Sequence, residues 1–274
     1  AAAPGADVLV RVQVHNSKAL VDLNTKFGAP LDKALPLLRK AEQSGLHAKG
    51  ICFHVGSQSL STAAYEEALL LVHHRFLEAE ASGMHLTDLD IGGGFPIPSA
   101  EGLHVDLAAM FEAINRQLDR LFPHTAVWTE PGRFLCGTAM NLVTSVIGTK
   151  QRGDIPWYIL DEGIYGVFSG ILFDHWEYPL HCFGKGRKVP STFAGPSCDG
   201  IDVLYRDFPA PKLPIGAKVL VSDIGAYTTV SATRFNGFEP APVLIWEDQA
   251  DLVAKSRKTS EADKASESCL AQMP

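Results

Sequence analysis

The stretch Leu89-Asp90-Ile91-Gly92-Gly93-Gly94-Phe95-Pro96 indicates the fold more directly than any other part of the chain. It is typical of a short buried strand that runs straight into three glycines. Glycines at a strand exit let backbone N–H groups approach an anion closely, and oriented N–H groups suit phosphate. A tight strand-to-helix turn would need the same glycines. The triplet therefore predicts an anion site only in combination with other motifs.

Strand and helix patterns alternate on both sides of this stretch. Apolar or alternating runs predict strands at 7–14, 47–53, 86–91 and 125–129, and helical spacing predicts helices at 31–44, 62–82 and 105–121. Thr62 is a possible N-cap of the second helix, and Gly83 ends it. Strands that alternate with helices imply a parallel sheet with helical crossovers.

The number of strands sets the expected architecture. A closed (β/α)8 barrel needs twice as many strands as the four predicted here, so residues 1–138 are expected to form the C-terminal half of such a barrel. Short β-prone runs between Gly- and Pro-rich turns then predict a mainly β domain over 139–252. The polar stretch 253–274 is expected to be a disordered tail. The chain begins without methionine, which hints at a missing N-terminal portion.

Composition excludes several classes of function. The chain has 274 residues, 46% of them hydrophobic, which is ample for a globular core. Its formal net charge of −7 and the lack of a Lys/Arg cluster argue against nucleic-acid binding. No apolar run approaches the ~18 residues that span a bilayer, so no membrane contact is expected. Five cysteines without paired spacing argue against disulfides and a metal site, and fit the cytoplasm.

Three polar motifs follow three consecutive predicted strands. They are His54-Val55-Gly56-Ser57-Gln58, Gly92-Gly93-Gly94 and Glu130-Pro131-Gly132-Arg133. The carboxyl ends of parallel strands meet at one edge of the sheet, where barrels build their active sites. The motifs together predict a shared pocket.

Each residue type in this pocket has a chemical use and a simpler alternative. His54 could stack on a planar ring or act as an acid or base, or it could be a core histidine bonded to a carbonyl. Ser57 and the glycines offer donors to a phosphate, and Arg133 could add charge. Glu130 ends an apolar strand, so it needs a cation or a donor. That partner could be Arg133, or the protonated pyridine nitrogen of pyridoxal phosphate.

Seven motifs, in order along the chain, resemble those of the fold-type III pyridoxal-phosphate decarboxylases, the ornithine/lysine/diaminopimelate/arginine decarboxylase family. The motifs are Lys26-Phe27-Gly28, His54-Val55-Gly56-Ser57, Asp90-Ile91-Gly92-Gly93-Gly94-Phe95, Glu130-Pro131-Gly132-Arg133, Phe173-Asp174-His175, Gly195-Pro196-Ser197-Cys198-Asp199 and Gly225-Ala226-Tyr227. The resemblance covers residues 7–245. It implies an alanine racemase-like barrel that binds pyridoxal 5'-phosphate.

The resemblance also implies roles for single residues. His54 would stack on the cofactor ring and Glu130 would contact its pyridine nitrogen. The phosphate would be bound by Ser57, Gly92, Gly93, Gly94 and Arg133 of one subunit. Tyr227 of the partner subunit would complete this set. On local chemistry alone, the tyrosine could equally well only pack.

A second set of implied roles concerns the substrate. Cys198 would protonate the substrate Cα, although a lone cysteine is more often inert. Asp174 with its neighbour Phe173, and Asp199, would hold the distal ammonium of a basic amino acid. Cys198 and Asp199 would reach into the neighbouring site, so that the enzyme is a homodimer with shared active sites.

The paired acids favour L-ornithine or L-lysine as substrate, giving putrescine or cadaverine in polyamine biosynthesis. Diaminopimelate decarboxylases, an alternative, usually show Cys-Glu-Ser where this chain has Cys198-Asp199-Gly200. Two departures from the family pattern stand out. No lysine has the Tyr-Ala-x-Lys-Ala-like context of the Schiff-base lysine, and Asp22 stands where many relatives carry arginine. The expectation is a fragment of a decarboxylase, which would be inactive alone; the alternative is a non-catalytic, regulatory relative.

Overall fold

The protein is described by a computed structural model that covers residues 3–16, 19, 21–97 and 105–246. The expected disordered tail at 253–274 lies outside these residues.

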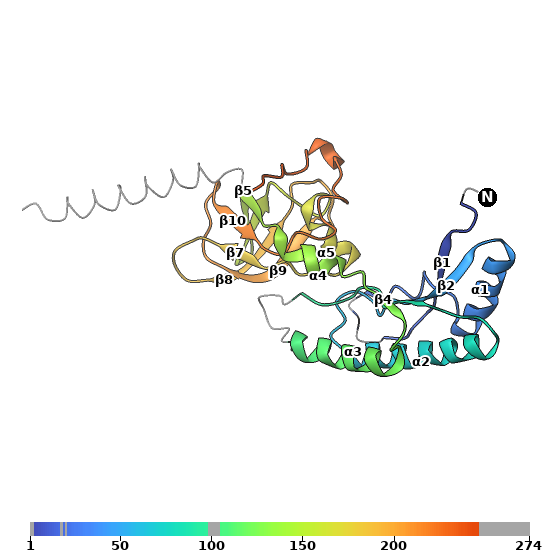
Figure 1. Cartoon of the computed structure of the whole chain (residues 1–274). Coiled ribbons are helices and arrows are strands. Elements are labelled where there is room, and N and C mark those ends of the chain that lie inside the picture. Colours follow the sequence, from blue (N-terminus) through green and yellow to red (C-terminus); the bar gives the residue numbers. More distant parts are fainter. Residues whose placement is uncertain (1–2, 17–18, 20, 98–104, 247–274) are drawn as a thin grey trace, which may run out of the picture.

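The N-terminal half of the chain contains a four-stranded parallel sheet in the order β1-β2-β3-β4 (Figure 1). Its strands are β1 (Asp7–Arg11), β2 (His47–Cys52), β3 (Asp88–Asp90) and β4 (Ala126–Trp128). Main-chain hydrogen bonds prolong the pairing past the strand ends. The N–H of Phe53 donates to the Asp90 carbonyl, and that of Ile91 donates to the Trp128 carbonyl, both at 3.0 Å. The loops after β2, β3 and β4 therefore start side by side.

Helices connect the strands of this sheet, as the sequence predicts. A 3-10 turn (Leu31–Lys33) leads into α1 (Ala34–Gln43), and α2 (Thr62–Ala81) and α3 (Leu107–Leu121) follow. Figure 1 shows α2 and α3 running along one side of the sheet. Asp106 caps α3, because its carboxylate accepts from the Ala109 N–H at 3.0 Å. The expected N-cap of α2 is wrong by one residue, since Ser61 precedes the helix and its side chain makes no capping bond.

The second half is built on a six-stranded sheet in the order β7-β10-β5-β6-β8-β9. Its strands are β5 (Leu142–Arg152), β6 (Ile155–Leu160), β7 (Leu180–Cys182), β8 (Val189–Ala194), β9 (Val203–Ala210) and β10 (Lys218–Val221). Within this sheet, as far as the described residues show, β6 and β8 pair in parallel and the other neighbours pair antiparallel. The short helices α4 (Gly132–Cys136) and α5 (Gly170–Phe173) and three 3-10 turns, at 137–139, 167–169 and 235–237, complete the described part. The expected partial barrel followed by a mainly β half is confirmed.

The two halves pack directly against each other. Ile97, a few residues past the glycine turn, is buried in the core of the second half. The N–H of Gly225 donates to the Gly137 carbonyl at 2.8 Å. A methyl group on Gly225 would lie 1.7 Å from the Cys136 carbonyl oxygen, so only glycine permits this approach. The loops of the second sheet are thereby held beside the carboxyl end of β4.

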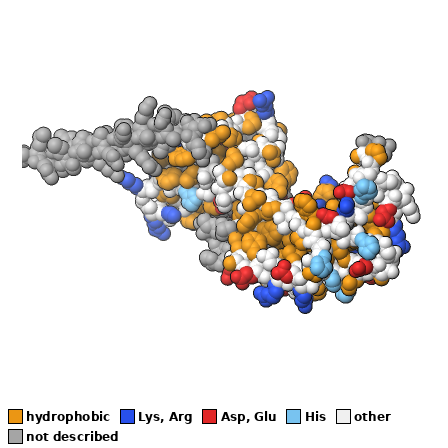
Figure 2. Space-filling model, in the orientation of Figure 1, with side chains coloured by type: hydrophobic (Ala, Val, Ile, Leu, Met, Phe, Trp, Pro, Cys, Tyr) orange, Lys and Arg blue, Asp and Glu red, His pale blue; other side chains and the backbone are white. Residues whose placement is uncertain are grey.

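Strand β4 lies at the edge of its sheet, and this corrects one expectation. The sequence predicts an apolar strand that buries Glu130 at its end, whereas all three β4 residues and Glu130 are exposed. No described strand pairs with the outer edge of β4, so its side chains have no cover. A groove of about 450 Å³ lies between α3, β4 and α4. Figure 2 shows hydrophobic side chains gathered across the middle of this face.

None of the helices in the described ranges is long and apolar enough to cross a membrane.

Candidate cofactor and substrate site

The glycine triplet brings three strand ends into close contact. Gly92 and Gly94 have φ angles of +68° and +94°, which L side chains rarely adopt. A methyl group on Gly93 would lie 2.3 Å from the carbonyl oxygen of Glu130, and one on Gly94 would lie 2.1 Å from that of Gly56. The three glycines are therefore needed for a tight turn, as one of the two interpretations of the triplet expects.

The same turn also leaves donors available. The N–H of Gly92 donates to the Asp90 carboxylate at 2.8 Å. Within the described part of the chain, the N–H groups of Gly93 and Gly94 donate to no acceptor. Such main-chain donors need a partner, and an anion placed at the turn would supply one. The turn interpretation and the anion interpretation are compatible.

His54 follows β2 and faces the glycine turn. A methyl group on Gly94 would lie 3.3 Å from its Cε1 atom. The Gly56 N–H donates to His54 Nδ1 at 2.9 Å, so the neutral ring carries its proton on Nε2. Burial and, second, the charge of Arg11 lower the pKa of His54 to about 4. The ring is uncharged near neutral pH, and among the described residues it donates to no carbonyl, whereas a core histidine would.

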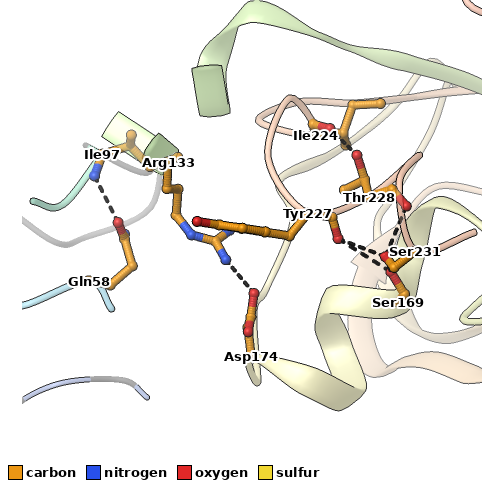
Figure 3. Close-up of polar contacts among 9 residues, drawn as sticks. All are labelled: Gln58, Ile97, Arg133, Ser169, Asp174, Ile224, Tyr227, Thr228 and Ser231. Carbon is orange, nitrogen blue, oxygen red and sulfur yellow. Dashed lines mark hydrogen bonds and ion pairs between the residues drawn. The ribbon is translucent and has the colours of Figure 1, made fainter. Parts of the chain in front are cut away.

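Ser57 and Gln58 complete this loop. The main-chain N–H of Ser57 donates to the Val21 carbonyl at 3.0 Å, and its side chain is half-buried. The Gln58 side chain is 3% exposed and accepts from the Ile97 N–H at 3.0 Å (Figure 3). Gln58 therefore ties the His54 loop to the segment after the glycine turn.

Arg11, at the end of β1, is a candidate site residue that the sequence motifs do not include. Its Nε and Nη2 atoms are buried and have no hydrogen-bond partner among the described residues. Its guanidinium carbon lies 5.1 Å from the centre of the Phe27 ring. A buried guanidinium without an acceptor is costly, so it indicates a place for an anion or a ligand acceptor. The available signal was a basic residue between Val10 and Val12 in an apolar strand.

Arg133 lies in α4 and pairs with Asp174, which follows α5 (Figure 3). The interpretation that Arg133 pairs with Glu130 is therefore wrong, because its Nη2 donates to the Asp174 carboxylate instead. The guanidinium carbon also lies 5.1 Å from the Trp176 ring centre and 5.0 Å from that of Tyr227. The buried Nε of Arg133 has no partner among the described residues.

Tyr227 belongs to this cluster in its own chain. The family resemblance implies that the partner subunit supplies this tyrosine, whereas its ring covers Arg133 of the same chain (Figure 3). A methyl group on Gly132 would lie 3.2 Å from its hydroxyl oxygen. The close packing of 225–227 against α4 brings the phenol to this position.

Cys198 and Asp199 lie in the loop between β8 and β9, which side-chain hydrogen bonds hold in place. The Asp199 carboxylate accepts from the Tyr165 hydroxyl, and this bond is the main cause that holds the pKa of Asp199 below its usual value. The Cys198 N–H donates to Asn236 Oδ1 at 3.0 Å. Asp202 is 3% exposed, and its carboxylate accepts from two main-chain N–H groups, those of Ile164 and Ser197, each at 3.0 Å.

The polar contacts of the described residues do not connect this loop with the cofactor edge of the same chain. In the described residues, no hydrogen bond or ion pair joins Cys198 or Asp199 to the His54 loop, the glycine turn or Arg133. Phe173, beside Asp174, is 68% exposed. The roles expected for Cys198 and Asp199 at a neighbouring site, and for Phe173 beside Asp174 in substrate binding, stay predictions.

Comparison with known proteins identifies the family. The sequence model described as "Pyridoxal-dependent decarboxylase, pyridoxal binding domain" matches residues 1–137. The lysine/ornithine decarboxylase of Selenomonas ruminantium is 73% identical over 263 residues, 96% of this chain and 67% of that protein. The chain belongs to the pyridoxal-dependent decarboxylases.

Solved structures of pyridoxal-dependent decarboxylases share the fold. A crystal structure of lysine decarboxylase from Selenomonas ruminantium matches with a TM-score of 0.86 at 75% identity, covering 92% of this chain and 66% of that chain. Lysine/ornithine decarboxylase from Vibrio vulnificus, complexed with cadaverine, matches with a TM-score of 0.78 at 37% identity, covering 86% and 61%. The chain thus spans about two thirds of the length of its relatives. The expected family and fold are confirmed.

The residues of this chain fit the family's cofactor. The free N–H groups of Gly93 and Gly94 suit a phosphate, and the orphaned Nε of Arg133 suits an acceptor oxygen. The uncharged His54 ring suits contact with an aromatic face. Pyridoxal phosphate is therefore the cofactor for which this edge of the sheet is suited.

Proposed function

We propose that the whole protein decarboxylates a basic L-amino acid, converting L-lysine to cadaverine or L-ornithine to putrescine. The observation that carries the proposal is the arrangement at the carboxyl edge of the parallel sheet. There, anion donors at the glycine turn adjoin the neutral His54 ring and the backbone of Glu130. The identity of 73% to a lysine/ornithine decarboxylase supports the same reaction.

The chain's own residues would hold the cofactor from three sides. The N–H groups of Gly93 and Gly94, the Ser57 hydroxyl, Arg133 and Tyr227 would bind the phosphate. The His54 ring would contact the cofactor ring, and Glu130 would keep the pyridine nitrogen protonated by accepting its hydrogen bond. When bound, pyridoxal phosphate supplies an electron-withdrawing ring that accepts the electron pair left as CO₂ departs.

The substrate would be held by carboxylates from two subunits. Asp174 of one subunit and Asp199 of the partner subunit would bind the distal ammonium. Cys198 of the partner subunit would deliver a proton to Cα after CO₂ leaves. The support is that Cys198 and Asp199 lie on a loop held by Tyr165 and Asn236, and that no hydrogen bond or ion pair among the described residues joins them to the cofactor edge of their own chain. A homodimer with shared sites accounts for this arrangement. Its reaction would serve polyamine synthesis in the cytoplasm.

The proposal is tested with the full protein. Titration with pyridoxal phosphate is followed by its visible absorbance, and diamine formation is assayed with L-lysine, L-ornithine and diaminopimelate. Cadaverine or putrescine should form, and Glu130→Ala should depress the rate at least about 100-fold. Glu67→Ala, an exposed glutamate on α2, is the matched control and should keep the wild-type rate.

Two results would contradict the proposal. Near-normal turnover by Glu130→Ala would remove the role of that carboxylate. Cofactor binding without product from any of the three amino acids would instead support a non-catalytic, regulatory protein.

A further inference from the structure

Arg133 and Asp174 form a partly buried ion pair in which one N–H group of the arginine has no acceptor among the described residues. Arg133 is 6% exposed, and the Asp174 side chain is 21% exposed. The aromatic faces of Trp176 and Tyr227 hold the guanidinium in place. Its Nε nevertheless has no acceptor among the described residues, so the arginine can accommodate a further anionic oxygen.

Asp174 is the anion that neutralises Arg133 in the described part of the chain. Glu130 makes no ion pair there. The nearby Tyr178 phenol is no substitute, because burial raises its pKa to about 12 and keeps it uncharged at neutral pH. A buried guanidinium requires a counterion, so Asp174 is retained until another anion takes its place.

We infer that Asp174 is an exchangeable counterion that couples the phosphate and ammonium sites. A phosphate bound to Arg133 satisfies Nε and supplies the negative charge that Asp174 now provides. Two anions on one guanidinium repel each other, so the phosphate releases the more exposed Asp174. The released carboxylate then needs a cation, and the distal ammonium of the substrate is one.

This inference rests on the proposed function, which places phosphate on Arg133 and the ammonium on Asp174. It adds that the two ligands bind with positive cooperativity. By linkage, phosphate must raise the affinity for diamine by the same factor as diamine raises the affinity for phosphate. An active site that works this way binds a basic substrate well only after its cofactor is in place.

The test uses the full protein freed of cofactor, with inorganic phosphate and cadaverine as ligands in calorimetric titrations. In the wild type, saturating phosphate should lower the Kd for cadaverine at least about 5-fold, and the reverse titration should give the same factor. In Asp174→Asn, phosphate should bind more tightly than in the wild type and the coupling factor should fall to one. The matched control is Asp199→Asn, which should weaken cadaverine binding while the coupling remains.

Several outcomes would overturn the inference. Unchanged cadaverine affinity in saturating phosphate would show independent sites, and this measurement needs no variant. Equal phosphate affinity in wild type and Asp174→Asn would show that no exchange occurs. If the wild type binds no phosphate, the inference also fails, whereas the cofactor titration and the diamine assay judge the proposed function separately.

Discussion

The hydroxyl of Tyr165 donates a hydrogen bond to the carboxylate of Asp199, and this contact connects the turn after β6 to the loop that carries Cys198. Two further contacts support the same loop. Asp202 bridges it to the Ile164 N–H, and Asn236 accepts from the Cys198 N–H. The Tyr165 ring also lies 4.1 Å from the Phe235 ring, measured between centroids. The proposed substrate acid is thereby fixed before any ligand arrives.

Removal of the Tyr165 hydroxyl should weaken substrate binding more than turnover. In Tyr165→Phe the ring still packs on Phe235, but Asp199 loses the bond that orients it. We expect KM for the basic amino acid to rise about 3- to 10-fold with a smaller change in kcat. Steady-state kinetics of the full protein measure both.

The pH dependence distinguishes this role from a merely structural one. Tyr165 holds the pKa of Asp199 below its usual value, so the carboxylate stays charged in mild acid. Without the hydroxyl the pKa rises, and the acid-side increase in KM should begin at a higher pH. An unchanged KM profile in Tyr165→Phe, with a changed one only in Tyr165→Leu, would show that ring packing alone matters.

His54 should make the folded protein less stable in acid. Its pKa is about 4 in the folded state and 6.5 in the unfolded state, so the unfolded chain binds a proton first as the pH falls. Its contribution is fully present above pH 6.5 and is lost as the pH falls towards 4. Between about pH 7 and pH 5, the wild type should lose about 1 to 2 kcal/mol more stability than His54→Gln. Denaturant unfolding at several pH values measures the difference, and equal losses would contradict the prediction.

The charge of Arg11 should be visible in the titration of His54. Arg11 is the second cause of the lowered pKa after burial, so Arg11→Gln should raise the pKa of His54 above about 4 without restoring 6.5. Lys26→Gln is the matched control, because Lys26 contacts the same Phe27 ring. NMR titration of labelled histidine measures the shift. The prediction fails if both substitutions move the pKa equally.

Gly93 should tolerate no side chain. Alanine there would place its Cβ 2.3 Å from the Glu130 carbonyl oxygen, and backbone on both sides cannot move freely. We expect Gly93→Ala to cost about 2 to 4 kcal/mol of unfolding free energy. At Gly200 the same change meets nothing within 4 Å and should be nearly neutral. Thermal unfolding of both variants tests the contrast.

Local sequence patterns were sufficient to predict the strands and helices of the parallel sheet. The helix expected at 105–121 begins at Leu107 because Asp106 caps it, a difference of two residues. The position of the His54, glycine and Glu130 motifs at one sheet edge also follows from strand order. These features depend on periodicity and on residues close together in sequence.

Long-range packing could not be predicted in the same way. The partner of Arg133 is Asp174, 41 residues away, rather than nearby Glu130. Their contact depends on how α4 and α5 meet, for which the sequence holds no local signal. The exposure of Glu130 likewise depends on β4 being an edge strand. Arg11 was missed because a lone cation in a strand does not show on which face it lies.

The indole that covers Arg133 gives the protein its own optical reporter. Trp176 is 4% exposed and faces the guanidinium, whereas Trp157 is half-buried and Trp128 and Trp246 are 58% and 67% exposed. A shielded indole emits at shorter wavelengths than a hydrated one, and a cation held over its face perturbs that emission. Any event that moves Arg133 should therefore change the blue edge of the tryptophan fluorescence. Ligand arrival can be followed in real time without a dye.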